Sequence, residues 1–136
     1  MEHKTVSFEL NGMRFEYDEE KNRANIKKHG ISFRNAARVF FDYDRIEFYD
    51  EETEEDRFDT IGDTSAGNAL LTRQGVSSTM IGDISRFTAE KNDILYVVYT
   101  ERYIKDDAGK ERDVTRIISA RLATPFERGL YYGKSD

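Results

Sequence analysis

Residues 6–17 read VSFELNGMRFEY, in which apolar and polar side chains alternate on either side of Asn11-Gly12. An Asn-Gly pair readily adopts the two positive-φ positions of a type I′ turn. The stretch therefore predicts a β-hairpin in which Phe8 lies opposite Phe15. Because side chains alternate between the two faces of a strand, the apolar ones gather on one face. This hairpin predicts the start of a sheet with one buried face.

Two helices are expected directly after the hairpin. Asp18 is a good N-cap for a helix over about residues 19–29, and Gly30 is a typical stop. Ser32 is a good cap for a second helix. Its apolar residues follow the i, i+3, i+4, i+7 spacing of a buried stripe: Phe33, Ala36, Ala37 and Phe40.

The rest of the chain predicts more strands and a last helix. Residues 45–49 and 57–61 form a second hairpin pattern, and residues 94–99 and 116–123 have the composition of adjacent strands. Thr124-Pro125-Phe126-Glu127 has the pattern of a helix start with a capping box. Residues 62–92 are rich in Gly, Ser and Thr and predict a loop-rich insertion, either a functional flap or a segment holding one short strand.

These elements predict one α+β domain over residues 1–136. We expect an antiparallel sheet of about five to six strands, packed by two N-terminal helices and a short C-terminal helix. The chain of 136 residues is long enough for a core of its own, and 8 Tyr and 9 Phe supply large contact areas. No apolar run approaches the length that spans a bilayer, so the expected location is the cytoplasm, without membrane contact.

The composition excludes several classes of chemistry. There is no Cys, which excludes disulfide scaffolds, thiolate metal sites and cysteine nucleophiles. With two His residues, a histidine-based metal site is not expected, and no cofactor motif is present. The net charge is −6, but the charges are segregated: residues 21–41 contain six cations and no acid, whereas residues 42–59 are strongly acidic. The basic block predicts an anion-binding face: Lys21, Arg23, Lys27, Lys28, Arg34 and Arg38.

One face of the first helix carries a candidate catalytic set. Lys21, Asn25 and Lys28 follow helical spacing, and His29 lies beside them. These side chains suit RNA cleavage by the adjacent 2′-hydroxyl, which needs a base, a proton donor and cations for the phosphorane charge. The alternative is a solvated helix face, with His29 favoured at the helix end as a cation.

The late strand supplies a second candidate set. Ser119 and Arg121 share one face by alternation, and an Arg on a packed sheet suits phosphate oxygens. An internal ion pair or simple exposure explains Arg121 equally well. Tyr99 could stack on an unpaired base, although packing in the core is the simpler interpretation.

Several motifs in one order resemble the BrnT toxin family. Residues 15–33, FEYDEEKNRANIKKHGISF, are similar to the family signature. The similarity continues in AARVF at 36–40, VVYTER at 97–102, RIISAR at 116–121, and Glu127-Arg128 with Tyr131. It covers nearly the whole chain outside the insertion. Tyr17 stands where the family often has Trp, and Leu122 stands where a Lys often follows.

This resemblance implies a RelE-like fold and a metal-independent endoribonuclease. It also implies a ribbon-helix-helix antitoxin of the BrnA type as partner, with DNA contacted only through the toxin–antitoxin complex. The implied functional residues are Lys21, Lys28, His29, Arg116, Ser119 and Arg121. In the hypothesis, Lys28 or His29 is base or acid, and Arg116 and Arg121 hold the phosphate. The alternative is a catalytically silent module that only docks an antitoxin.

Overall fold

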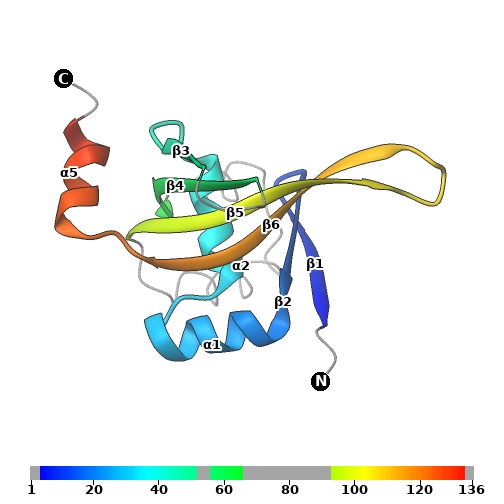
Figure 1. The fold of residues 1–136 in the computed structure, drawn as a ribbon, viewed down its shortest axis with the longest axis horizontal. Coiled ribbons are helices and arrows are strands. Elements are labelled where there is room, and N and C mark those ends of the chain that lie inside the picture. Colours follow the sequence, from blue (N-terminus) through cyan, green and yellow to red (C-terminus); the bar gives the residue numbers. More distant parts are fainter. Residues whose placement is uncertain (1–3, 52–55, 66–92, 134–136) are drawn as a thin grey trace, which may run out of the picture.

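The structure is a computed structural model that describes residues 4–51, 56–65 and 93–133. These residues form an α+β fold with a six-stranded sheet in the order β1-β2-β6-β5-β4-β3 (Figure 1). The strands are β1 (Thr5–Leu10), β2 (Met13–Asp18), β3 (Ile46–Asp50), β4 (Arg57–Asp63), β5 (Ile94–Lys105) and β6 (Glu111–Leu122). Within the described residues, no helix is long and apolar enough to cross a membrane.

The N-terminal hairpin forms as its sequence predicts. β1 and β2 are antiparallel, and Phe8 lies opposite Phe15. The turn residues Asn11 and Gly12 have φ angles of 50° and 81°, as a type I′ turn requires. The two rings stack with their centroids 5.3 Å apart, so the pairing also contributes to the core.

The sheet is mixed, which corrects the prediction of an antiparallel sheet. β2 runs parallel to β6, with Glu16 opposite Arg116, whereas all other neighbours are antiparallel. Parallel neighbours need a long connection, and here the connection from β2 to β6 contains all the intervening elements. Alternation along one strand carries no information about the direction of a distant partner, which is why the sequence did not reveal this pair.

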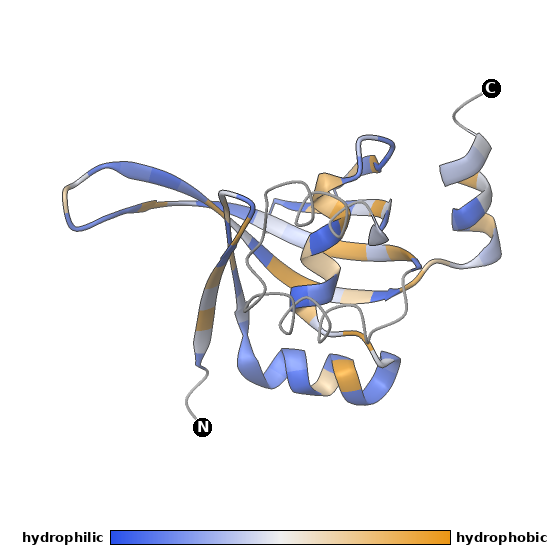
Figure 2. Cartoon of the chain, turned by 180° about the vertical axis from the view of Figure 1, so that it is seen from behind, coloured by the Kyte–Doolittle hydropathy of each residue, from blue (hydrophilic) through white to orange (hydrophobic). Residues whose placement is uncertain are grey.

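Helix α1 (Glu19–His29) begins and ends where expected. The Asp18 side chain accepts a hydrogen bond from the Glu20 N–H at 3.0 Å, and the Gly30 N–H donates to the Ile26 carbonyl at 2.7 Å. Gly30 has a φ of 73°, which disfavours any residue with a Cβ. Most of α1 is hydrophilic (Figure 2). It therefore contributes charged groups to the surface rather than bulk to the core.

The second helix differs from the prediction. α2 spans only Phe33–Ala36 and continues as the 3₁₀ helix η1 (Ala37–Phe41). Ser32 is the N-cap, as expected, and accepts from the Asn35 N–H at 3.0 Å. The 3₁₀ turn still buries Val39 and Phe40, so the apolar stripe lies against the sheet. Gly62 on β4 fits here because a Cβ would lie 2.9 Å from that of Val39.

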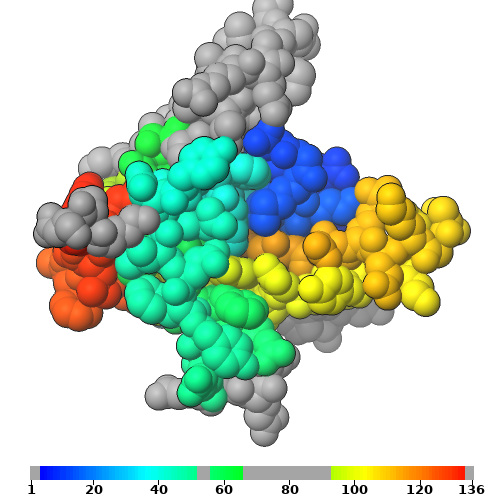
Figure 3. Space-filling view, turned by 90° about the horizontal axis from the view of Figure 1, so that it is seen from above, coloured from blue at the N-terminus to red at the C-terminus, as the bar shows by residue number. Residues whose placement is uncertain are grey.

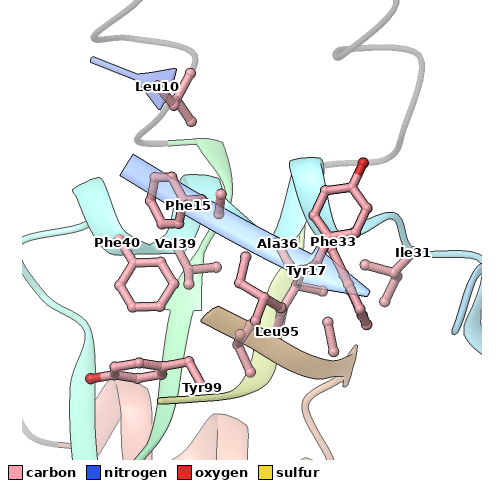
Figure 4. Packing of buried hydrophobic residues seen from close by; sticks show 14 residues of the cluster. Leu10, Phe15, Tyr17, Ile31, Phe33, Ala36, Val39, Phe40, Leu95 and Tyr99 are labelled. Atoms are coloured by element: carbon pink, nitrogen blue, oxygen red, sulfur yellow. The ribbon is translucent and has the colours of Figure 1, made fainter. Parts of the chain in front are cut away.

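The main core lies between one face of the sheet and α2 with η1. Phe15, Phe33 and Val97 are fully buried there, and Figure 4 shows Phe40 next to Tyr99. The Phe40 and Tyr99 rings meet edge to face at 4.8 Å. Burial of such aromatic side chains is the main stabilising contribution to the fold.

The last helix, α5 (Pro125–Gly133), is not packed into this core. Its capping box forms: the Glu127 carboxylate accepts from the Thr124 N–H, and the Glu127 N–H donates to the Thr124 hydroxyl. None of its residues is fully buried, but Tyr131 packs against a second, smaller cluster of Ile61, Ile94 and Ala123. The expected C-terminal helix therefore forms, and it packs outside the main core. Figure 3 shows α5 at one end of the molecule and the tip of the β5–β6 hairpin projecting at the other.

The first two residues of the expected insertion at about 62–92 belong to β4. β4 continues through Asp63, and the Thr64 N–H donates to the Asp93 carbonyl at 3.1 Å. Residues 66–92, where a functional flap or one short strand was expected, lie outside the described residues.

Candidate RNA-binding groove

A β-bulge decides which side chains of β6 share a face. The ladder pairs Val98 with Ser119 but Tyr99 with Ile117, so Ile118 is one extra residue on β6. An extra residue reverses the alternation on its own strand from that point on. Simple alternation would place some residues before the bulge and some after it on opposite faces of the sheet. Because of the bulge, these residues lie on the same face.

Arg116, Ser119 and Arg121 all lie on the sheet face opposite the core. Each pairs with a residue of β5 that alternates with the buried Val97 and Tyr99. Simple alternation had placed Ser119 and Arg121 together and Arg116 on the other face. The bulge corrects this and brings Arg116 to the face that holds the other two candidates.

An open groove of about 580 Å³ lies on this face beside α1. Lys21 reaches it from α1, Arg57 from β4, and Arg102 and Arg116 from β5 and β6. Thr100, Ile118 and the carboxylates of Asp56 and Glu101 complete the described lining. Four cations around one groove favour an anionic ligand, although the chain as a whole is negative.

The groove includes two cations that the sequence analysis missed. Arg57 lies on β4, in the acidic segment, and Arg102 lies in the outer half of β5. The ladder pairs Arg57 with Thr100, and Thr100 pairs with Arg116. The register of β4 against β5 would have predicted that Arg57 lies at the groove. The sequence of a single strand does not reveal that register.

Asn25 attaches α1 to the edge of β6. Its side-chain amide donates to the carbonyls of Ile31 at 2.9 Å and Ala120 at 2.8 Å, and its oxygen accepts from the Ala120 N–H at 3.2 Å. The described pairing of β2 with β6 covers Thr115 and Arg116, well before Ala120. The amide therefore takes the place of a neighbouring strand. Both of its hydrogens are used, which leaves none for the expected contact with RNA.

Arg121 has a carboxylate partner on α5. Its guanidinium donates to both oxygens of Glu127, at 2.7 Å and 2.9 Å, and lies 4.3 Å from the centroid of the Tyr96 ring. The hydrogen bond from Arg121 lowers the pKa of Glu127 to about 2. Arg121 does not line the groove that contains Lys21 and Arg116. Arg121 thus forms an internal ion pair, with Glu127 as the acid.

This pair predicts a pH dependence of α5 attachment. Because the folded pKa of Glu127 lies below its ordinary value of 4.5, its charge stabilises the fold above that pH. The contribution is lost as pH falls from about 4.5 toward 2. We expect the difference in Tm between wild type and Glu127→Gln to be largest at pH 7 and to shrink below pH 4.5. A pH-independent difference would contradict the assignment.

The C-terminal turn of α1 is exposed and does not line the groove. Lys27, Lys28 and His29 are all exposed, and none of them lines it. His29 lines a separate cavity of about 160 Å³, whose lining also includes Asp93 and Leu122. The structure therefore brings Lys21 and Arg116 together but does not place Lys28 or His29 beside them.

Tyr99 belongs to the core. Only 3% of it is exposed, and its ring stacks on Phe58 at 5.5 Å. Its hydroxyl donates to a Glu47 carboxylate oxygen at 3.1 Å, and burial raises its pKa. A ring enclosed in this way offers no face to a base, so the packing interpretation of Tyr99 agrees with the structure.

A comparison with protein families relates this geometry to a known activity. Residues 17–85 match the family described as the ribonuclease toxin BrnT of type II toxin–antitoxin systems. The chain belongs to the BrnT family. The BrnT match includes Lys21 and Arg57 of the groove, whereas Arg102 and Arg116 lie beyond it. No curated protein matches the chain significantly. Among the described residues, no three His, Asp or Glu side chains are grouped as a metal ion would need.

Proposed function

We propose that this protein is a toxin that cleaves RNA internally, without a metal ion, by attack of a 2′-hydroxyl on the adjacent phosphate. The observation that supports this best is the convergence of Lys21 and Arg116 in one open groove. A BrnT ribonuclease toxin needs a surface that binds an RNA phosphate, and this is the described cavity with the most cations.

The groove residues have chemistry suited to the phosphate. An Arg guanidinium donates two parallel hydrogen bonds to phosphate oxygens, and the Lys21 ammonium adds a mobile point charge. Such donors stabilise the negative charge that develops on the phosphorane. Thr100 supplies a hydroxyl from the same wall.

The remaining assignments rest on the family resemblance. We propose Lys28 or His29 as the proton-transfer groups, and Lys27 and Ser119 as further RNA contacts. Lys28 and His29 are exposed on the last turn of α1, so an RNA strand that leaves the groove along α1 would pass them.

The chemistry is tested by incubating the purified protein with end-labelled RNA in EDTA. We expect internal cuts whose upstream products carry a 2′,3′-cyclic phosphate, and no cuts where the 2′-hydroxyl is replaced by hydrogen. Loss of cleavage in EDTA, or cleavage of the 2′-deoxy substrate, would contradict the proposed reaction. Sequence preference would follow from the positions of the cuts.

The two possible roles of Arg121, phosphate binding and attachment of α5, predict different results for variants of Arg121 and Glu127. If Arg121 also contacts the RNA, Arg121→Ala should lower cleavage about tenfold, whereas Glu127→Ala, which frees the guanidinium, should preserve cleavage or raise it. We expect this outcome, measured as kcat/KM on one RNA. Equal loss of thermal stability in both variants, with cleavage preserved, would leave Arg121 with the anchoring role alone.

A type II toxin acts with an antitoxin, and the catalytically silent docking module remains the second candidate. The observation that favours docking is the outward face of α5, where Phe126 is 76% exposed and Leu130 40% exposed. These side chains are one helical turn apart and form an apolar strip. We propose that a ribbon-helix-helix antitoxin of the BrnA type covers this strip, and that DNA is bound only by the complex.

The proposed antitoxin interface is tested by introducing acidic side chains on α5. We expect Phe126→Asp with Leu130→Asp to weaken binding of the cognate antitoxin at least tenfold, because burial of two large apolar side chains is lost. Tyr103→Asp changes an aromatic residue that is 71% exposed on the β5–β6 hairpin, at the other end of the molecule, and serves as the control. Equal binding by the wild type and the α5 double variant, measured by calorimetry, would contradict this interface.

A further inference from the structure

Glu16 on β2 contacts two of the cations that line the groove but does not line it itself. It is the parallel partner of Arg116, and its side chain is 7% exposed. One carboxylate oxygen, Oε1, is 2.7 Å from Nη1 of Arg102 and 3.3 Å from Nη1 of Arg116. A single buried oxygen thus contacts two of the four cations that line the groove.

The burial of the Glu16 carboxylate costs free energy, which points to a role for this residue. A carboxylate that is nearly removed from water is destabilising unless cations compensate it. Two guanidinium groups that share one oxygen repel each other unless a negative charge lies between them. Glu16 supplies that charge, so Arg102 and Arg116 can lie side by side.

Both guanidinium groups line the groove while they contact Glu16. Within the described residues, Glu16 Oε1 and Arg116 Nη1 are buried and neither makes a hydrogen bond of acceptable geometry. The contacts are therefore electrostatic. Because Arg116 Nη1 is itself buried, a ligand in the groove would meet the exposed part of the Arg116 side chain. The Arg102 side chain is 49% exposed and the Arg116 side chain is 26% exposed, and both residues line the groove.

We propose that Glu16 is a positioning residue that holds Arg102 and Arg116 as a pair, so that both guanidinium groups bind the non-bridging oxygens of one RNA phosphate. Glu16 itself does not touch the RNA. This inference rests on the proposed function and adds a second phosphate-binding residue, Arg102, together with the residue that orients the pair.

The test compares Glu16→Gln with the wild type. The substitution keeps the side-chain size and removes one negative charge from the groove, so attraction alone would tighten RNA binding and speed cleavage. Positioning predicts a split: we expect kcat to fall at least tenfold while the affinity for an uncleavable 2′-deoxy RNA does not weaken. Glu16→Asp keeps the charge and should recover part of kcat. Glu9→Gln is the matched control, because Glu9 pairs with Arg14 outside the groove.

Each outcome decides a different point. Unchanged or higher kcat in a folded Glu16→Gln protein would overturn the positioning role while leaving the proposed function intact. Equal loss of kcat and affinity, with a lower Tm, would overturn it as well, since it would indicate a structural role. A wild-type protein that does not cut RNA would overturn the proposed function and this inference with it.

Discussion

Replacing Arg116 by alanine should lower RNA cleavage by about two orders of magnitude while the protein stays folded. Arg116 lines the groove together with Lys21 of α1, and it contacts Glu16. It lies on β6, a central strand of the sheet and the neighbour of β5. Removal of a preorganised donor to developing phosphate charge typically costs about a hundredfold or more in rate. The measurement is kcat/KM on a short labelled RNA, with the Tm recorded for each variant.

Arg112→Ala provides the matched control for this prediction. Arg112 lies on the same strand, pairs with Asp106 at 3.0 Å near the tip of the hairpin, and does not line the groove. We expect its cleavage rate to stay within about twofold of wild type, since exposed ion pairs contribute little. If Arg116→Ala cuts RNA as fast as Arg112→Ala, the groove is not where the phosphate binds.

The elements that depend on local signals were predicted well. The Asn11-Gly12 turn, the Asp18 cap, Gly30 and the capping box before α5 all form, because each depends on residues a few positions apart. The second helix begins where predicted, but only Phe33–Ala36 are α-helical and Ala37–Phe41 form a 3₁₀ helix. Its apolar spacing fits a helix, whereas the chain tightens into a 3₁₀ turn against β4.

The candidate site depends on pairings between residues that are far apart in sequence. These pairings account for the differences between the predicted and the observed site. The parallel pairing of β2 with β6 brings Glu16 beside Arg116, although they are far apart in sequence. The bulge at Ile118 moves Arg116 to the open face. Neither feature has a signature in the local sequence. The helix face that was expected to be catalytic is divided in space: Lys21 lines the groove, Asn25 binds the backbone of β6, and Lys28 and His29 do not line the groove.

Asn25 gives the second large expected effect, on stability. We expect Asn25→Leu to lower the free energy of unfolding by about 3 kcal/mol, because the Ala120 N–H and two carbonyls lose their partner while remaining largely buried. The edge of β6 near Ala120 would then have no hydrogen-bonding neighbour among the described strands. Urea unfolding followed by circular dichroism measures the change.

The control for this prediction is Lys27→Leu, two residues further along α1, which introduces the same side chain at an exposed position. Its free energy of unfolding should stay within about 0.5 kcal/mol of wild type.

The effect of Asn25→Leu should extend to function, since Asn25 fixes the helix that carries Lys21 to the groove. We therefore expect cleavage to fall even where the variant is still folded, because a 1 Å displacement of a binding group lowers rates strongly. An Asn25→Leu protein as stable as Lys27→Leu would show that packing, not this amide, holds α1 against β6.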